Sequence, residues 1–556
     1  MSRLNESKRI VIIGAVAAGT SAAAKARRND ETAEIVIYEM DEHISYSGCG
    51  LPYYIGGKVA KLEELTPRDP KFFRDKYEVE ILIRHKVLSV NPATKTLVVE
   101  NLVTGETFTD CYDVLILSTG ATSIVPPIPG VDLAHVFTLR NPLSARAIRT
   151  YIEEHQPKTA VVVGSGFIGL EMVENLVDAG ILVTVVEKLP QVCPFVDPDL
   201  APYIEETLVK KHVTVLTGVA ATEIWTGSVH LDDGSTVDAD LVILAVGVRP
   251  NTALAQAMGV ALGQTRAIAV NTRMQTNIPD VYACGDCTES FSIVDGRPIY
   301  RPLGSTANKM GRIAGDAITG GSLEFRGIAG TGILKLFDRT IAASGLNEKQ
   351  ARDSGYDIVI SHNIKPDKPE YYGGKEMVIK AIADRKTEKL LGVQIVGYEG
   401  VDKRMDVFVT AMTAGLGVSD LFHLDLAYAP PFATTKDPVL YTGMILDNAL
   451  HRGRDIITAD DLMATAPDDI QVVDARVAKQ YQEHHVDHAV SMPHSSLREQ
   501  MAALDKNKPV VTYCNKGTTG NAAQNILINH GFRKVYNLSG GHKQYKACKK
   551  CHEKKQ

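Results

Sequence analysis

Cys49 is the residue of this chain whose surroundings most favour redox chemistry. It lies in the segment Ser45-Tyr-Ser-Gly-Cys-Gly-Leu-Pro-Tyr-Tyr-Ile-Gly-Gly57, which contains no second cysteine. A cysteine without a nearby partner must form its oxidised state with an external atom. It can become a sulfenic acid, or it can bond to another sulfur as a mixed disulfide or persulfide. Either cycle needs a thiolate, and the Gly-Leu-Pro turn can supply a helix start that lowers the pKa of the thiol.

Cys514 occupies a second position at which a thiolate can be stabilised. The stretch Val511-Thr-Tyr-Cys-Asn-Lys-Gly-Thr-Thr-Gly520 predicts a strand end, a short loop and the start of a helix. Backbone N–H groups and the dipole at a helix N-terminus favour both a thiolate and a bound persulfide. The sequence therefore contains two candidate sulfur-reactive sites, far apart along the chain.

Two closely spaced cysteine pairs carry weaker signals. Cys548-Lys-Lys-Cys551-His552 matches a haem-attachment pattern, but that chemistry requires export from the cell. We expect the tail to be a flexible, lysine-rich end, and we expect Cys287 to be a packed residue. Neither this pair nor Cys284 with Cys287 is assigned a function, and no metal site is predicted.

The first of two glycine-containing turns, Gly14-Ala-Val-Ala-Ala-Gly19, can hold the pyrophosphate of a dinucleotide. It follows the apolar run Ile10–Ile13, and Glu39 lies twenty-five residues after Gly14. Such a site needs a backbone that approaches the pyrophosphate at a helix start and a carboxylate that binds the ribose. Val16 stands where the middle glycine is usual, so this turn alone is a weak signal.

The second turn, Gly164-Ser-Gly-Phe-Ile-Gly169, matches the dinucleotide fingerprint in full. Glu187 ends the next apolar run, Val183-Thr-Val-Val-Glu187. A carboxylate there favours NADH over NADPH because it repels a 2′-phosphate, although Lys188 follows directly. Two nucleotide sites are therefore expected.

The elements that position these residues alternate between strands and helices up to about residue 320, which is typical of α/β domains with parallel sheets. Strand patterns at Met377–Ile382 and Leu391–Val396 and a helical stretch at Asp402–Leu416 then predict an α+β domain. A further α/β pattern runs from Asp469 to about Tyr545. The sequence thus predicts several domains, in keeping with its length.

The composition of the chain indicates which kind of partner it can bind. The chain has 556 residues, 44% hydrophobic and 23% charged, with a formal net charge of -6. This balance favours small-molecule partners over nucleic acid or a membrane surface, and no apolar run approaches the length of a bilayer span. The N-terminus imitates a signal peptide but continues as a βαβ unit, and the eight cysteines are scattered. We therefore expect a soluble protein of the reducing cytoplasm.

The two nucleotide turns, combined with three further segments, resemble the flavin disulfide reductase family that binds two dinucleotides. The segments are Leu117-Ser-Thr-Gly120, Ala245-Val-Gly-Val-Arg-Pro-Asn251 and Val281-Tyr-Ala-Cys-Gly-Asp286. The resemblance implies that FAD is held by Gly14, Gly19, Glu39, Thr119, Gly120 and Asp286. It implies that NADH or NADPH is held by Gly164, Gly166, Gly169 and Glu187.

The Cys49 segment closely resembles those of the coenzyme A-disulfide reductases and the NADH-dependent polysulfide and persulfide reductases. The resemblance covers about residues 8–445 and includes Tyr428-Ala-Pro-Pro-Phe432 and Lys436-Asp-Pro-Val439. It implies a homodimer in which Tyr428 reaches across the interface to the sulfur of coenzyme A, which is a substrate or a tightly bound cofactor. A second tyrosine of that family corresponds to Tyr371 or Tyr372, and Arg68 is a candidate for the coenzyme A phosphates.

The C-terminal region resembles a single rhodanese domain. The resemblance rests on Val472-Val-Asp-Ala-Arg476, His485-Val-Asp-His-Ala-Val-Ser-Met-Pro493, the Cys514 loop and Asn537-Leu-Ser-Gly-Gly541. Related loops often have an arginine after the cysteine or near the loop end, where this chain has Asn515, Thr518 and Thr519, leaving Lys516 as the loop's cation. We therefore expect thiosulfate to be a poor sulfur donor. The domain either delivers sulfane sulfur from Cys514 or only binds partners.

The predicted fold is α/β, with two Rossmann-like dinucleotide-binding domains, an α+β dimerisation domain and a C-terminal rhodanese-like domain. We place the FAD-binding domain at residues 1–155 and 252–325 and the NAD(P)H-binding domain at 156–251. The dimerisation domain follows at 326–449, a linker at 450–462 and the rhodanese-like domain at 463–556.

The predicted function is NAD(P)H-dependent reduction of sulfur–sulfur bonds in polysulfide, coenzyme A persulfide or coenzyme A disulfide. The chief alternative is an NADH oxidase or peroxidase that uses a cysteine sulfenic acid. That branch typically carries a histidine just after the first glycine turn, and residues 15–28 contain none. A third hypothesis is a sulfur-binding carrier or sensor, against which the intact Cys49 segment and Tyr428 argue.

Overall fold

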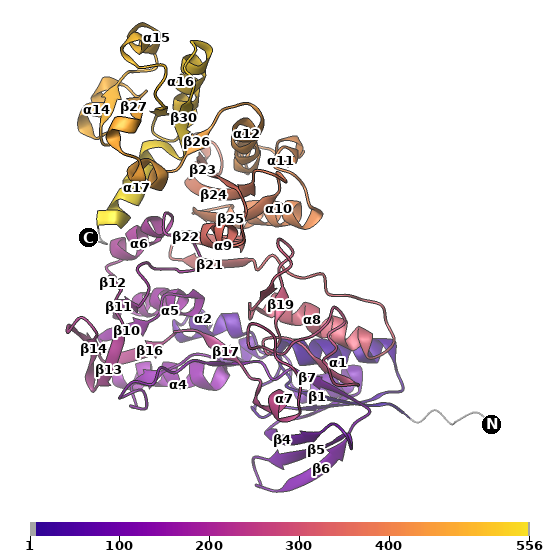
Figure 1. Cartoon of the computed structure of the whole chain (residues 1–556). Helices are drawn as coiled ribbons and strands as arrows, with labels where there is room; N and C mark the ends of the chain where they lie inside the picture. The colour runs from indigo at the N-terminus through magenta and orange to yellow at the C-terminus, as the bar shows by residue number, and fades with distance from the viewer. Residues whose placement is uncertain (1–6, 554–556) are drawn as a thin grey trace. The chain divides into compact units, whose positions relative to one another are not determined.

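The structure is a computed structural model that describes residues 7–553 (Figure 1). The described chain forms two compact units. The first runs up to Val186 and includes Val219–Ile328; the second comprises Glu187–Gly218 and the chain from Ala329 onward. No helix among the described residues is long and apolar enough to cross a membrane.

The first unit contains a five-stranded parallel sheet in the order β18-β7-β1-β2-β3. Its strands are β18 (Val281–Ala283), β7 (Val114–Leu117), β1 (Arg9–Ile13), β2 (Glu34–Tyr38) and β3 (Val79–Leu82). Both faces are covered, which explains why the strands are nearly continuous apolar runs. The apolar run Ile10–Ile13 lies in β1, and the βαβ unit expected at the N-terminus is formed by β1, a helix over Ala17–Asn29 and β2.

Helices α1 (Ala17–Asn29) and α8 (Gly304–Ala317) pack closely against each other (Figure 1). A Cβ atom at Gly311 would lie 2.2 Å from the Ala18 carbonyl oxygen, and one at Gly315 would lie 2.3 Å from that of Ala22. Glycine is needed at both positions because the two backbones approach within contact distance.

A second parallel sheet of this unit contains β11 (Leu182–Glu187), β10 (Thr159–Val163), β16 (Leu241–Leu244) and β9 (Val136–Phe137). Helices α4 (Pro142–His155) and α5 (Phe167–Asp178) belong to the same part of the chain. The unit also contains two antiparallel three-stranded sheets. One is formed by β4 (His85–Asn91), β5 (Thr96–Asn101) and β6 (Thr107–Cys111), and the other by β13 (Ala221–Trp225), β14 (Gly227–Leu231) and β15 (Thr236–Ala239).

The second unit contains an antiparallel sheet in the order β21-β22-β25-β24-β23. Its strands are β21 (Gly332–Leu336), β22 (Arg339–Gly345), β25 (Leu390–Gly397), β24 (Glu376–Asp384) and β23 (Ile358–Pro366). Helices α10 (Val401–Ala414) and α12 (Pro438–His451) pack on it. The strands predicted around Met377–Ile382 and Leu391–Val396 are confirmed, and the predicted helix ends at Ala414, before Gly415 in the left-handed region.

The C-terminal sheet is parallel, in the order β26-β30-β29-β27-β28. Its strands are β26 (Ile456–Ile457), β30 (Val535–Leu538), β29 (Val510–Tyr513), β27 (Gln471–Asp474) and β28 (Ala489–Ser491). Helix α16 (Thr518–Asn529) follows β29, and α17 (Gly541–Glu553) ends the described chain. The stretch 450–462, interpreted from the sequence as a linker, contains β26 and the start of α13 (Ala459–Ala464).

The expectation of a flexible C-terminal tail is wrong for the described residues. Helix α17 runs to Glu553 and packs against α6 (Ala201–Lys210) (Figure 1). Cys548 is only 2% exposed, and Gln544 donates a hydrogen bond to its sulfur at 3.4 Å. The many lysines suggested a fully solvated segment, but one face of the helix is buried and contains Gln544, Tyr545 and Cys548.

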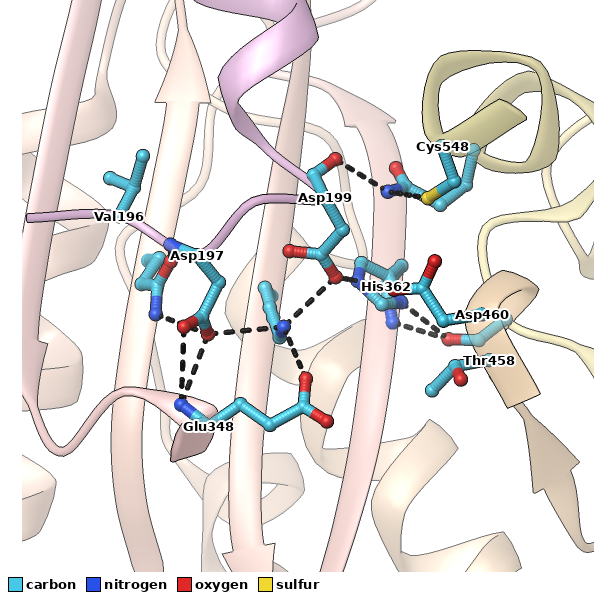
Figure 2. Close-up of polar contacts among 12 residues, drawn as sticks. Val196, Asp197, Asp199, Glu348, His362, Thr458, Asp460 and Cys548 are labelled. Atoms are coloured by element: carbon cyan, nitrogen blue, oxygen red, sulfur yellow. Dashed lines mark hydrogen bonds and ion pairs between the residues drawn. The ribbon is translucent and has the colours of Figure 1, made fainter. Parts of the chain in front are cut away.

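A buried ion cluster joins the segment 187–218 to the antiparallel sheet (Figure 2). The Lys380 ammonium, fully enclosed on β24, lies 3.0 Å from Asp197, 2.9 Å from Asp199 and 2.7 Å from Glu348. Burial alone would raise the pKa of Asp199, but Lys380 and His362 more than offset burial and hold it below its usual value. One lysine therefore compensates three carboxylates from two parts of the sequence.

The same cluster reaches the C-terminal domain through His362. Its Nε2 lies 2.7 Å from Asp199 Oδ2, and its backbone N–H donates to Ser539 Oγ at 2.6 Å (Figure 2). Gln544 donates to the Asp199 carbonyl at 2.8 Å. Ser539 precedes Gly540 and Gly541, so these bonds attach the C-terminal domain next to the Cys514 loop.

Candidate functional site

In the first nucleotide turn, backbone carbonyl oxygens approach two glycines so closely that no side chain fits there. Gly14 has φ +105°, and a Cβ atom there would lie 2.3 Å from the Ser118 carbonyl oxygen. A Cβ atom at Gly19 would lie 1.9 Å from the Gly14 carbonyl oxygen. Only glycine fits these two positions, which brings the end of β1 against the start of α1. Val16 is accommodated as the residue before α1.

The remaining predicted flavin residues lie at the same edge of this parallel sheet. Glu39, which follows β2, is 7% exposed and accepts hydrogen bonds from the backbone N–H groups of Ala15 at 2.7 Å and Asp41 at 2.9 Å. Burial raises the pKa of Glu39. Thr119 and Gly120 follow β7, and Thr119 Oγ1 donates to the Asn251 carbonyl at 2.7 Å. This edge fits the adenosine and pyrophosphate of FAD.

Asp286 follows β18 at that edge and is already paired. Arg140 Nη2 lies 2.9 Å from its Oδ2, and Tyr300 donates to its backbone carbonyl at 2.8 Å. Neither Arg140 nor Tyr300 was predicted from the sequence, because each approaches Asp286 only through the tertiary fold. Cys287, expected to be a packed residue, is fully buried.

The second nucleotide turn has the geometry of a pyrophosphate cradle. Gly164 has φ +100°, and a Cβ atom there would lie 2.5 Å from the Ala245 carbonyl oxygen, while one at Gly169 would lie 2.1 Å from that of Gly164. A Cβ atom at Gly166 would meet nothing within 4 Å. Gly166 therefore leaves room beside the start of α5 rather than relieving a contact within the protein. Glu187, at the end of β11, accepts from the Leu189 N–H at 2.9 Å.

Cys49 lies in a single 3₁₀ turn, Gly48–Gly50, that leads directly into α2 (Leu51–Ile55). The side chain is exposed. The pKa of the Cys49 thiol is raised, first because the surrounding protein partly excludes water from the sulfur and then by the carboxylates of Glu171 and Asp286. Arg140 acts in the opposite direction and lowers it. The helix start was expected to lower this pKa, but burial and the two carboxylates act in the opposite direction.

Glu171 is a candidate site residue that sequence reasoning missed. It lies on α5, where burial, and then the neighbouring Glu174, raise its pKa to about 7. Glu174 itself is paired with Lys58 at 2.5 Å. An acid inside the otherwise apolar run Phe167–Val173, two residues beyond Gly169, was the available signal. Glu171 therefore gains and loses its proton near neutral pH, within electrostatic range of Cys49.

The tyrosines predicted to serve coenzyme A belong to the second unit and are exposed. Tyr371 is 75% exposed, Tyr372 50% and Tyr428 50%. The rings of Tyr371 and Tyr372 lie 5.4 Å apart in a short 3₁₀ turn. Arg68, in the first unit, is also exposed, with its guanidinium 5.4 Å from the centre of the Phe72 ring.

The Cys514 loop forms a compact cradle at the start of α16. Cys514 is 7% exposed, and its sulfur accepts the Gly517 N–H at 3.2 Å. Gly517 has φ +104°, a conformation that favours glycine, and its carbonyl accepts from Asn537 Nδ2 at 3.1 Å. Arg476, which the sequence analysis did not assign to this loop, pairs with Asp474 at 2.6 Å and lies 3.4 Å from Asn515 Oδ1.

The fold and the two nucleotide turns define a flavin- and pyridine nucleotide-dependent oxidoreductase. Residues 8–308 match the model of the pyridine nucleotide-disulphide oxidoreductases, and residues 333–438 match the dimerisation domain of the same proteins. This chain belongs to the pyridine nucleotide-disulphide oxidoreductase family. Residues 458–548 match the rhodanese-like domain, so the predicted fold class and family are confirmed.

Three known proteins are similar over most or all of the chain. The solved structure of reduced Bacillus anthracis CoADR-RHD is 36% identical, with a TM-score of 0.95 and 98% of each chain covered. That of an NAD-dependent persulfide reductase from A. fulgidus is 34% identical, with a TM-score of 0.89, covering 97% of this chain and 100% of the other. A "NAD(P)H coenzyme A polysulfide/persulfide reductase" of Pyrococcus horikoshii is 36% identical over 448 residues, 80% of this chain and 99% of the relative.

Proposed function

We propose that this protein uses NADH or NADPH to reduce sulfur–sulfur bonds in coenzyme A persulfide, polysulfide or coenzyme A disulfide, as a homodimer. The observation that carries the proposal is the single cysteine of the Cys49 turn, within electrostatic range of Asp286, in a chain that matches CoADR-RHD over 98% of its length. The names of the persulfide reductases support the same substrate class. The dimerisation domain supports the homodimer.

In the proposed cycle the Cys49 thiolate attacks one sulfur of the substrate and breaks its sulfur–sulfur bond. With coenzyme A disulfide this forms a Cys49–coenzyme A mixed disulfide and releases one coenzyme A thiolate. FAD, with NADH or NADPH as the electron source, would supply the two electrons that restore the Cys49 thiolate and release the second thiol. With coenzyme A persulfide or polysulfide, attack on an outer sulfur releases coenzyme A thiolate or a shortened polysulfide and leaves a persulfide on Cys49, whose two-electron reduction releases hydrosulfide.

In this proposal Cys49 reacts with the substrate, and the protonation state of Glu171 changes the electrostatic environment of the Cys49 thiolate. Burial, and then the neighbouring Glu174, raise the pKa of Glu171 to about 7, so about half of the molecules carry a neutral Glu171 at neutral pH. A neutral Glu171 imposes less negative charge on the Cys49 thiolate than an ionised one. We assign Glu171 as a positioning residue that keeps this thiolate accessible at neutral pH.

The C-terminal domain supplies sulfane sulfur in this proposal, with a persulfide on Cys514 as the carrier. The cradle of Gly517 N–H and helix start supports an anionic sulfur at that position. Tyr428 and one of Tyr371 and Tyr372 are assigned to the coenzyme A sulfur, and Arg68 to its phosphates. Each assignment is tested by conservative substitution of the residue concerned.

The test is anaerobic turnover of the FAD-loaded dimer with NADH. Loss of NADH and release of hydrosulfide are followed with polysulfide, coenzyme A persulfide, coenzyme A disulfide and peroxide. Cys49→Ser should abolish all sulfur reduction while retaining the flavin, whereas Cys111→Ser, at another exposed cysteine, should behave like the wild type. Peroxide as the fastest acceptor would instead assign the enzyme to the sulfenic-acid branch.

Cys514→Ser separates the two sulfur sites. It should slow turnover with polysulfide and leave reduction of coenzyme A persulfide unchanged, because only the first route begins at Cys514. An equal loss with both substrates would refute this division of labour and would favour a structural or docking role for the rhodanese-like domain.

A further inference from the structure

We propose that Lys365, from the dimerisation domain, supplies the cation that binds anionic sulfane donors at the Cys514 sulfur-transfer site, with thiosulfate as the probe. The inference rests on the proposed role of Cys514 as a persulfide carrier. It replaces the expectation, drawn from a loop without arginine, that thiosulfate is a poor donor.

Lys365 reaches the loop from another domain. It lies on β23, and its Nζ donates a hydrogen bond to Thr518 Oγ1 at 3.1 Å. Thr518 is the first residue of α16, four residues after Cys514. The lysine thus places a cation at the start of this helix, beside a loop that contains no arginine of its own.

The Lys365 ammonium is held in place by an aromatic ring. It lies 4.0 Å from the centre of the Tyr441 ring on α12, and Lys436 lies 5.9 Å from the same centre. A ring face attracts a cation without neutralising it. Two lysines directed at one ring raise the positive potential on this side of the Cys514 loop.

The loop's own cation is already compensated. Lys516 and Lys543 both form ion pairs with the carboxylate of Glu376 on β24. Burial would raise the pKa of Glu376, but the two lysines lower it, so the carboxylate remains charged. In the part of the chain that the structure describes, Lys365 contacts a hydroxyl and a ring, which leaves its charge available to a donor.

The contacts at the loop restrict the size of the donor. Cys514 is 7% exposed, and residues on both sides of its loop are attached to the antiparallel sheet, Thr518 by Lys365 and Lys516 by Glu376. The low exposure of Cys514 and these attachments favour a small donor over a folded protein that carries a persulfide. In this proposal the donor is a small anion that binds to the ammonium of Lys365.

The chemistry balances with thiosulfate as donor. The Cys514 thiolate attacks the outer sulfur, a new sulfur–sulfur bond forms, and the bond within thiosulfate breaks to release sulfite. Both electrons of the broken bond leave with sulfite, so Cys514 becomes a persulfide with no other oxidant. An acceptor thiolate, or cyanide in an assay, then takes the outer sulfur and restores the Cys514 thiolate.

The test measures sulfur transfer from thiosulfate to cyanide by the FAD-loaded dimer. Lys365→Met should raise the KM for thiosulfate about tenfold, as expected for loss of a charge-assisted contact, with kcat within about twofold. Lys365→Arg should restore most of the affinity. Lys335→Met, at an exposed lysine of β21, is the matched control and should leave the KM unchanged.

Thr518→Val distinguishes charge from architecture. It removes the hydrogen bond from Lys365 but keeps the ammonium, so the KM should change by less than about threefold. If Thr518→Val and Lys365→Met have equal effects, Lys365 acts by holding the loop and the proposal fails. NADH-dependent reduction of coenzyme A persulfide at Cys49 reports in each variant that the dimer is folded.

Failure of the inference differs from failure of the proposed function. Wild-type sulfur transfer that Cys514→Ser abolishes, combined with an unchanged KM in Lys365→Met, overturns the role of Lys365 alone. Absence of sulfur transfer in the wild type, or its persistence in Cys514→Ser, overturns the carrier role of Cys514 and the inference with it.

Discussion

The carboxylate of Asp199 and the ammonium of Lys380 form an ion pair 2.9 Å long in a site from which water is almost fully excluded. The two residues are 181 positions apart in sequence. Asp199 precedes α6, Lys380 belongs to the antiparallel sheet, and Gln544 of the C-terminal domain donates to the Asp199 carbonyl. This pair is therefore the point at which three parts of the second unit are joined.

Lys380→Met should destabilise the second unit by about 3–5 kcal/mol, because it leaves buried carboxylates without a compensating charge. The measurement is the urea midpoint at which the buried Cys548 becomes reactive to a thiol reagent. Lys335→Met, at an exposed lysine, should leave that midpoint unchanged. Equal midpoints for Lys380→Met and the wild type would mean that the cluster contributes no net stability.

Glu171→Gln should stabilise the first unit at alkaline pH. The pKa of Glu171 is raised from 4.5 to about 7, so folding disfavours its ionised form. The resulting loss of stability is absent below pH 4.5, grows as the pH rises through 7 and is constant above it. At pH 8 the variant should melt about 2–4 °C above the wild type, which corresponds to about 1 kcal/mol for a partly exposed group. At pH 4.5 the variant and the wild type should melt at the same temperature.

The same substitution should alter Cys49. An ionised Glu171 raises the pKa of the Cys49 thiol, so Glu171→Gln should speed alkylation of the NADH-reduced enzyme at pH 8 and have little effect at pH 6. Glu63→Gln, at an exposed glutamate, is the control. A rate that increases equally at both pH values would show that the effect is steric rather than electrostatic.

The nucleotide turns were predictable from sequence because their requirements are local. Gly14 and Gly164 adopt φ values that favour glycine, and the apolar runs before them can only be buried strands. The residues that the sequence did not reveal depend on distant neighbours. In the sequence, Lys380 and Lys365 resemble any other lysine on a strand. Only the fold places Asp199 beside Lys380 and Thr518 beside Lys365.

The C-terminal tail was mispredicted for a related reason. Its lysines suggested a solvated end, whereas the apolar face is narrow and carries a glutamine, a tyrosine and a cysteine. The direction of the Cys49 pKa was mispredicted because the local turn favours a thiolate, whereas burial, and then Glu171 and Asp286 from distant parts of the sequence, raise the pKa of the thiol. In both cases local pattern and tertiary environment act in opposite directions.

Thiol labelling tests the placement of the tail. In the native, NADH-reduced enzyme Cys49 and Cys111 should react quickly, whereas Cys284 and Cys548 should be protected until the protein is unfolded. Mass spectrometry of digests resolves the four sites. Cys548 reacting as fast as Cys111 would restore the interpretation of a flexible tail.

Gly164→Ala and Gly166→Ala should separate folding from nucleotide binding. Gly164 has φ +100° and an alanine Cβ would lie 2.5 Å from a backbone oxygen, so that variant should fold poorly. Gly166→Ala meets nothing within 4 Å, so it should fold, retain FAD and melt like the wild type. Its methyl group would instead occupy the space that the pyrophosphate of NADH needs, which should raise the KM for NADH about tenfold or more.

Steady-state kinetics at saturating polysulfide measures the KM for NADH, and flavin absorbance verifies that the enzyme is loaded with FAD. An unchanged KM in a fully loaded Gly166→Ala enzyme would mean that the nucleotide does not approach this turn, which would remove the structural basis for assigning the second glycine turn to NADH.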